Sequence, residues 1–203
     1  MANNKDIATT IRQTIQQAKS PAIFFISDFP DFGYEYVRKV LSAMVAQGEL
    51  MRLANGIYLK PQMTQFGPLQ PTTDAVVEAI TAHDAAKVLP TGATAENMLG
   101  LSEQVPMNLV YLTNGSSRVI QLGNHTIKLK RVVPKYFAIE NRVLAILCLA
   151  MKSIGEQNIS DEQMSRIRQI IRSEKDKPGF AKDVQLMPLW INRIITSISK
   201  ENL

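Results

Sequence analysis

The sequence predicts an α+β protein of two domains, and three observations lead to this class. An Asn-Gly pair at residues 55–56 lies between two short apolar runs, which is the strongest short-range signal for a β-hairpin. A stretch with three prolines and no periodicity follows at residues 60–73. Beyond it come strand-like runs and then long helical patterns, which is typical of an α+β domain.

Length and composition are those of an ordinary globular protein. The chain has 203 residues, of which 45% are apolar and 20% charged, so it can bury a sizeable core. The longest apolar run, residues 143–151, is too short to span a bilayer, and the first residues form no apolar leader. The single cysteine, Cys148, fits a reducing compartment, so we expect a cytoplasmic protein. A net charge of +5 permits a polyanionic partner without requiring one.

The first domain is expected to begin with helix, strand and a short helical turn. Residues 5–19 carry apolar side chains at helical spacing, and Ser20-Pro21 ends that helix. The run "AIFFI" predicts a buried strand, after which Ser27 or Asp28 caps one turn of helix. A longer helix follows Gly33 and ends at Gly48. Its inward stripe is predicted to be Val37, Val40, Leu41, Met44 and Val45.

The opposite face of this longer helix is short-chained, polar and partly cationic. It consists of Glu35, Lys39, Ser42 and Ala46, with Tyr36 and Arg38 on its flanks. The order of helix, strand, short helix, helix and hairpin predicts a winged helix-turn-helix over residues 1–61, whose second helix enters the major groove of DNA. In the hairpin, or wing, the residue types that contact backbone phosphates are Arg52, Asn55 and Lys60. Winged helices also serve as protein-binding modules, and a polar helix face can simply be solvated.

Residues 62–73 are predicted to be a linker, and residues 74–203 a second domain. A helix capped by Thr72 or Thr73, a strand at 86–90 and a short helix ending at Gly100 are expected first. Strand runs at 109–113, 118–122 and 126–133, joined at Asn114-Gly115 and Gly123-Asn124, then predict a three-stranded antiparallel meander. The basic segment Lys128–Arg131 lies on its last strand and is interpreted as a solvated face.

The C-terminal third is predicted to be helical. Residues 138–155 are apolar nearly all round, which indicates a buried helix. Ser160 and Gln163 form a possible capping box for the next helix, whose arginines are read as a solvated face. Pro188 is expected near the start of the last helix, with Trp190 as a core anchor.

No constellation of residues predicts catalysis. The two histidines, His83 and His125, have neither cysteine partners nor HExxH spacing, so no metal site is expected. Phosphate-binding, dinucleotide-binding and nucleophile-elbow motifs are absent from the sequence. We therefore expect no enzyme activity and no cofactor.

Several stretches resemble the AbiEi-type antitoxin family of bacterial type IV toxin-antitoxin systems, and in particular its short branch. They are "FFISDFPDFGYEYVRKVLSAMVAQGELMRLANGIYLKP", "PTGATAENMLGLSEQVP", "YLTNGSSR" and "LMPLWINRII", so the match runs from about Ile7 to about Ile195. The resemblance implies a winged helix that binds the system's own promoter and a domain that opposes a nucleotidyltransferase-like toxin. It implies residues 34–42 as the recognition helix, beginning at Tyr34, and residues 52–60 as the wing.

Two functions of different class stay open. In the first, the protein is a DNA-binding autoregulator and antitoxin. In the second, it is an adaptor whose winged helix binds a protein and ignores nucleic acid. Glu35 and the two tyrosines make the tip of the predicted recognition helix less basic than that of many DNA readers. Salt-dependent binding to the promoter would separate the two functions, because only phosphate contacts release counterions.

Overall fold

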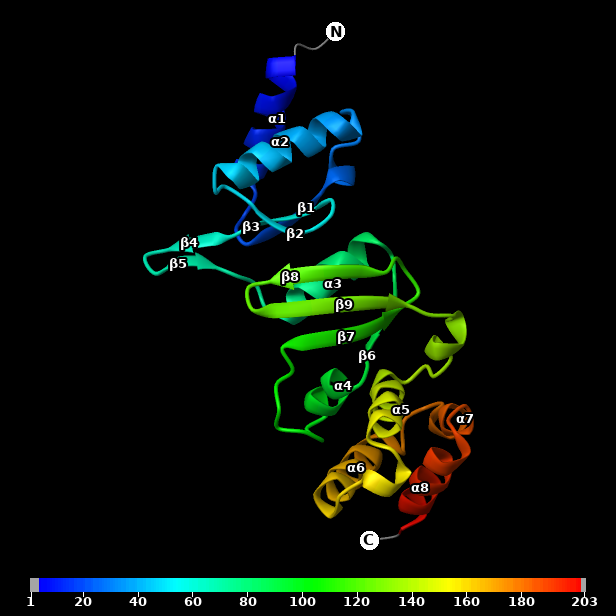
Figure 1. Cartoon of the computed structure of the whole chain (residues 1–203). Helices are drawn as coiled ribbons and strands as arrows, with labels where there is room; N and C mark the ends of the chain where they lie inside the picture. The colour runs from blue at the N-terminus through cyan, green and yellow to red at the C-terminus, as the bar shows by residue number, and fades with distance from the viewer. Residues whose placement is uncertain (1–3, 202–203) are drawn as a thin grey trace. The chain divides into compact units, whose positions relative to one another are not determined.

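A computed structural model describes residues 4–201, and its contacts divide the chain into two compact units. The first unit runs to Ala82 and includes residues 120–124, while the second comprises residues 83–119 and 125–203. Figure 1 shows the elements with their labels. Residues 1–3, which the predicted first domain includes, lie outside the described residues.

The first unit begins with the predicted series of helices and strands. The elements are α1 (Asn4–Gln17), β1 (Ala22–Phe25), the 3-10 turn η1 (Ile26–Asp28), α2 (Tyr34–Ala46), β2 (Met51–Ala54) and β3 (Ile57–Lys60). The three strands form an antiparallel sheet in the order β1-β3-β2. The hairpin prediction is confirmed, because β2 and β3 pair antiparallel on either side of Asn55-Gly56, where Gly56 has a positive φ of 75°.

The core of this unit lies among α1, α2 and the sheet. Four members of the predicted α2 stripe are buried, namely Val37, Val40, Leu41 and Met44, whereas Val45 is only partly covered. They pack with apolar side chains of the other elements, chiefly Ile11, Ile15, Phe24, Phe29 and Tyr58. One face of α2 is therefore fixed against the core, which leaves the other face outward.

A second hairpin occupies the segment that the sequence indicated as a linker without regular structure. Its strands are β4 (Gln62–Thr64) and β5 (Gly67–Leu69). The Thr64 hydroxyl holds the turn, since its oxygen donates to Gly67 O at 2.8 Å and accepts from Phe66 N at 3.2 Å. Helix α3 (Thr73–His83) follows, and Thr72 Oγ1 accepts from Ala75 N as the predicted cap.

A four-stranded sheet with the order β6-β7-β9-β8 follows in the chain. Its elements are β6 (Val88–Pro90), β7 (Asn108–Thr113), β8 (Arg118–Leu122) and β9 (His125–Arg131), with helix α4 (Ala93–Met98) after β6. The three predicted strands exist, but the predicted antiparallel meander is wrong. Strand β7 pairs in parallel with β9, with Leu112 opposite Lys130, and β8 lies beyond β9.

The reason lies at Asn114-Gly115, which does not form the expected hairpin turn. At the Asn55-Gly56 turn the glycine has a positive φ, whereas neither Asn114 nor Gly115 has one. Instead Asn114 Oδ1 accepts a hydrogen bond from Lys87 N at 2.7 Å, and Gly115 N donates to Thr113 Oγ1 at 3.0 Å. These bonds extend the pairing of β7 with β6, so β8 has no place beside β7.

The C-terminal part is helical, as predicted. It contains η2 (Pro134–Phe137), α5 (Arg142–Ile154), η3 (Glu156–Asn158), α6 (Asp161–Glu174), α7 (Phe180–Gln185) and α8 (Leu189–Lys200). Helix α5 is buried continuously from Leu144 to Met151 at the centre of the second unit's core. The capping box of Ser160 and Gln163 at the start of α6 is confirmed.

Trp190 is not the predicted core anchor. Its side chain is only partly buried and packs at the margin of the core, whereas Ile191, Ile195 and Ile198 of the same helix are buried. Successive residues of a helix point about 100° apart, so the face centred on Ile191 leaves Trp190 at its edge.

Among residues 4–201, no helix is long and apolar enough to cross a membrane.

Candidate nucleic-acid interface

The outward face of α2 carries most of the predicted contact residues. Glu35, Lys39 and Ser42 are exposed there, because the opposite face of the helix is committed to the core. Tyr34, at the first turn, is 56% exposed, and Tyr36 is half-buried against the core. The structure therefore brings these residues together on one accessible surface.

Arg38 is not a free cation on this surface. Its Nη2 and Nε both donate to Glu35 Oε2, at 2.7 and 3.1 Å. These hydrogen bonds, together with the negative charge of Glu35, raise the pKa of Arg38 above its ordinary value. Lys39 has no carboxylate partner within the described part of the chain, so it supplies the unpaired positive charge of this helix face.

The turn between β2 and β3 carries a second polar group. Arg52 is exposed, and its Nη2 donates to Asn55 Oδ1 at 3.0 Å. Its Nε also lies 3.4 Å from Ala54 O, so the guanidinium group lies back over the turn. Arg52 and Asn55 therefore form one exposed polar tip, with no carboxylate bound to the arginine in the described residues.

The short turn η1 joins this tip to the start of α2. Ile26 N donates to Gly56 O at 3.2 Å, which fixes the hairpin turn against η1, and η1 in turn packs against α2. Asp28 stabilises η1 because its Oδ2 accepts from Phe25 N at 2.8 Å. The turn and the helix are thus held by the same three-residue element (Figure 1).

Lys60 does not join this surface. It lies at the opposite end of β3, where its Nζ donates to Gln16 O at 2.7 Å and Ala18 O at 2.8 Å. Strand geometry puts it about 10 Å from the turn, at roughly 3.3 Å per residue. The Lys60 ammonium therefore satisfies carbonyls at the C-terminal end of α1, a common arrangement for a cation at such an end.

Acidic side chains reduce the net positive charge around the start of α2. Asp28 and Asp31 are exposed in the preceding turn, and Glu35 follows in the first turn of the helix. Among the predicted contact residues that the structure describes, Arg38 is paired with Glu35 and Lys60 is bound to backbone carbonyls, so Lys39 and Arg52 are the cations left on this surface. Any binding of phosphates here rests on few charges.

Sequence reasoning missed the apolar side chains on the β4–β5 hairpin. Phe66 at its turn is 92% exposed, Met63 is 69% exposed and Leu69 is 53% exposed. The sequence predicts a linker there because the stretch has three prolines and no periodicity, and strands of three residues are too short to show any. Its signal in the sequence was Gly67, which follows Phe66 and has a φ of 111°.

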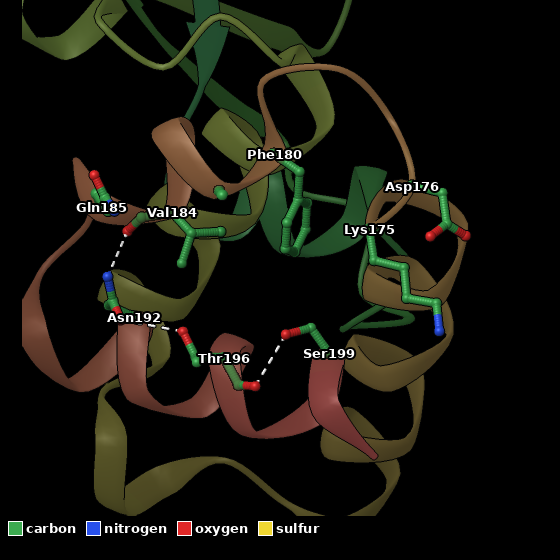
Figure 2. A pocket seen from close by; sticks show the side chains of 9 residues that line it. Lys175, Asp176, Phe180, Val184, Gln185, Asn192, Thr196 and Ser199 are labelled. Atoms are coloured by element: carbon green, nitrogen blue, oxygen red, sulfur yellow. Dashed lines mark hydrogen bonds between the residues drawn. The ribbon is translucent and has the colours of Figure 1, made fainter. Parts of the chain in front are cut away.

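The second unit has hollows of its own, and Figure 2 shows one of them, near α7 and α8. Three of its polar side chains, on α8, already bind one another or the backbone. Asn192 Nδ2 donates to Val184 O at 2.9 Å, Thr196 Oγ1 donates to Asn192 Oδ1 at 3.2 Å, and Ser199 Oγ donates to Thr196 O at 2.9 Å. The first bond joins α8 to α7, and the other two lie within α8, so these three side chains have a structural role.

Metal-binding side chains do not gather in the described structure. Within residues 4–201, no group of three or more histidine, cysteine, aspartate or glutamate side chains could hold a metal ion. His83 instead lies 3.0 Å from Asp84, which also pairs with Arg118 at 2.8 Å. His125 belongs to strand β9.

Comparison with known proteins gives one result. Residues 10–178 match the model of a family described as a family of unknown function, DUF6088. No curated protein matches the chain. The family description states no activity, so the resemblance to AbiEi-type antitoxins stays a prediction.

Proposed function

This chain belongs to the DUF6088 family, and we propose that its first unit is a winged helix-turn-helix that binds double-stranded DNA. The observation that carries the proposal is the pairing of two exposed polar surfaces through η1. The outer face of α2, with Lys39 and Ser42, and the hairpin tip, with Arg52 and Asn55, are fixed to one short element. In a winged helix these two surfaces flank each other on the same duplex.

The contacts have different roles in this proposal. Lys39 and Ser42 face the major groove, where they reach base edges and set preference among sequences, and the Lys39 ammonium also neutralises one phosphate. Arg52 binds a flanking phosphate, which gives affinity for any sequence. Lys60, which the sequence suggested as a second phosphate contact, has no part in this surface because its ammonium is bound at the end of α1.

By resemblance to AbiEi-type antitoxins, the duplex is the promoter of the protein's own operon. The protein then acts in the bacterial cytoplasm as an autoregulator and as the antitoxin to a nucleotidyltransferase-like toxin. No cofactor and no catalytic step enter this proposal. The antitoxin role is tested by sequencing the genes beside this one and co-expressing the protein with any nucleotidyltransferase-like neighbour that is found. Unrelieved growth arrest, with both proteins expressed and soluble, would exclude it.

DNA binding is tested by fluorescence anisotropy on promoter and scrambled duplexes at several salt concentrations. The wild-type slope of log K against log salt is expected to be about −2, at roughly −0.9 for each of two phosphates. Arg52→Gln should reduce the slope by about one and weaken binding to both duplexes alike. Lys39→Gln should reduce the slope in the same way, and it should also reduce the difference in affinity between the promoter duplex and the scrambled duplex. Lys19→Gln is the matched control, because this exposed lysine lies in the same unit, in the segment after α1.

A protein-binding adaptor is the second candidate, and the β4–β5 hairpin favours it. Exposed Met63, Phe66 and Leu69 are of types found at the centre of protein interfaces, where aromatic and methionine side chains are enriched. The pairing of Arg38 with Glu35 points the same way, since it reduces the positive charge of α2. Absence of binding to either duplex at about 0.1 M salt would exclude the DNA-reading role and leave this candidate.

A further inference from the structure

Two adjoining hollows in the second unit share three lining residues, Tyr136, Leu149 and Lys152. Their volumes are about 470 and about 520 Å³. Each lies within the range of roughly 300–1,000 Å³ that is usual for small-molecule sites. The two hollows therefore adjoin at these three residues.

The larger hollow is cationic, although more of its lining is apolar than polar. Lys130 of β9 and Lys152 of α5 line it, together with the hydroxyl-bearing residues Thr91 and Ser153. The register of β7 and β9 sets Lys130 beside Leu112, which lines the same hollow. Ser153 lies close to the backbone of Gly92, since a Cβ on Gly92 would be 3.9 Å from Ser153 Oγ. The cations and hydroxyls thus come from a strand and a helix that the core holds rigidly.

The positive charge of these hollows is uncompensated. A third lysine, Lys135, lines the smaller hollow, and neither lining contains an aspartate or glutamate among the described residues. Lys152 Nζ lies 5.7 Å from the centre of the Tyr136 ring and Lys135 Nζ lies 6.0 Å from it. Two of the three lysines therefore lie over an aromatic ring, and none of the three has a carboxylate partner in the described part of the chain.

The smaller hollow is mainly apolar. Ile139, Leu149, Leu186 and Pro188 line it beside the exposed edge of Tyr136. Leu186 is 50% exposed although it adjoins the core. An apolar wall next to an aromatic ring suits a flat ring system, which can stack on Tyr136 and cover these side chains.

We propose that this pair of hollows binds a nucleoside triphosphate, with its phosphates between Lys130 and Lys152 and its base against Tyr136 and the apolar wall. Lysine is a common phosphate ligand and acts there as a point charge. Hydroxyl groups such as those of Thr91 and Ser153 add directed hydrogen bonds to phosphate oxygens. The hollow of Figure 2 differs in both respects, because its hydroxyls are already bonded and Asp176 lines it.

Isothermal titration calorimetry on the full chain tests this site with ATP, tripolyphosphate and adenosine as probes. ATP should bind more tightly than either of the other two, because only ATP fills both hollows. Lys130→Gln and Lys152→Gln should each weaken ATP binding by about tenfold or more, the usual effect of losing one charged hydrogen bond. Tyr136→Leu should weaken ATP binding but leave tripolyphosphate binding unchanged, since Tyr136 holds the base.

Arg131→Gln is the matched control for Lys130→Gln. It removes the same charge from the next residue of β9, whose side chain leaves the opposite face of the sheet. If both variants weaken ATP binding equally, the attraction is general electrostatics and the site does not exist. Failure of ATP to bind at millimolar concentration, while circular dichroism shows a folded protein, would also overturn the proposal.

Nucleic acid is the competing polyanion, and the same variants distinguish it. If Lys152→Gln weakens binding to a duplex while ATP does not bind, the hollows contact a nucleic-acid backbone and the nucleotide proposal is wrong. Loss of DNA binding through Arg52→Gln would leave ATP binding unchanged, because Arg52 belongs to the first unit. The proposed nucleotide site and the proposed DNA interface can therefore fail independently.

Discussion

Replacing Glu35 by glutamine should strengthen DNA binding. Glu35 holds both Nη2 and Nε of Arg38 through one carboxylate oxygen, at 2.7 and 3.1 Å. Glutamine is nearly the same size but carries no charge, so the variant releases the arginine and removes a negative charge from the helix face. The pKa of Arg38, which the Glu35 hydrogen bond and charge raise, should fall toward its ordinary value, and Arg38 stays protonated.

The magnitude follows from counterion release. The wild-type surface has two cations without a carboxylate partner, Lys39 and Arg52, which predicts a salt slope of about −2. Freeing Arg38 adds a third, so the slope should steepen by about one. Relative to 1 M salt, one such contact is worth roughly a factor of 8 at 0.1 M salt. The Kd of the variant should therefore fall by about fivefold to tenfold under that condition.

Anisotropy on a promoter duplex and a scrambled duplex measures this change, and Glu49→Gln is the matched control. Glu49 binds Arg12 at 2.6 Å, so its replacement makes the same charge change and also releases an arginine. That arginine lies on α1 and not on the α2 surface, so we expect the Kd for DNA to change by less than twofold. An equal increase in DNA affinity for both variants would mean that net charge alone governs binding. An unchanged or weaker affinity of Glu35→Gln would refute the interface.

Three further predictions concern stability, measured by urea unfolding. Lys60→Gln removes two hydrogen bonds from the end of α1 and should cost about 1 kcal/mol, with DNA affinity unchanged. Trp190→Ala should cost about 2 kcal/mol, less than the 3–5 kcal/mol of a fully buried aromatic side chain. Burial raises the pKa of Glu174, but the hydrogen bonds from Lys177 and Asn141 lower it by more than burial raises it. The pKa of Glu174 therefore lies below its ordinary value. Stability should therefore decline below about pH 4 in the wild type, and this decline should be smaller in Glu174→Gln.

A specific result would contradict each of these three predictions. A Lys60→Gln protein of wild-type stability but weaker DNA binding would move Lys60 into the interface. A loss near 5 kcal/mol for Trp190→Ala would mean that the side chain is fully buried. The sign for Glu174 follows from its lowered pKa: the folded state favours the carboxylate, so its contribution is complete above the unfolded pKa and lost as pH falls through the folded one. If the free energy of unfolding falls equally at acid pH in the wild type and in Glu174→Gln, this reasoning is wrong.

Local patterns in the sequence determined most of the elements. The α2 stripe, the Asn55-Gly56 turn and the capping box of α6 were all predicted, because each depends on residues within a few positions of one another. For the same reason the outer face of α2 could be named in advance. The interface itself stays a prediction, since exposure of a residue does not reveal what binds it.

Only the tertiary structure decided which residues share a surface and in what order the strands pair. Lys60 looked like a wing residue, but the register of β3 with β1 carries it to the end of α1. Asn114-Gly115 looked like a hairpin turn, but a side-chain bond from Asn114 to the backbone of Lys87 redirects the chain, and β7 pairs with β9. The lysines that line the two hollows come from β9, η2 and α5, so no local pattern joins them. Periodicity is set by neighbours along the chain, whereas these contacts depend on where distant segments meet.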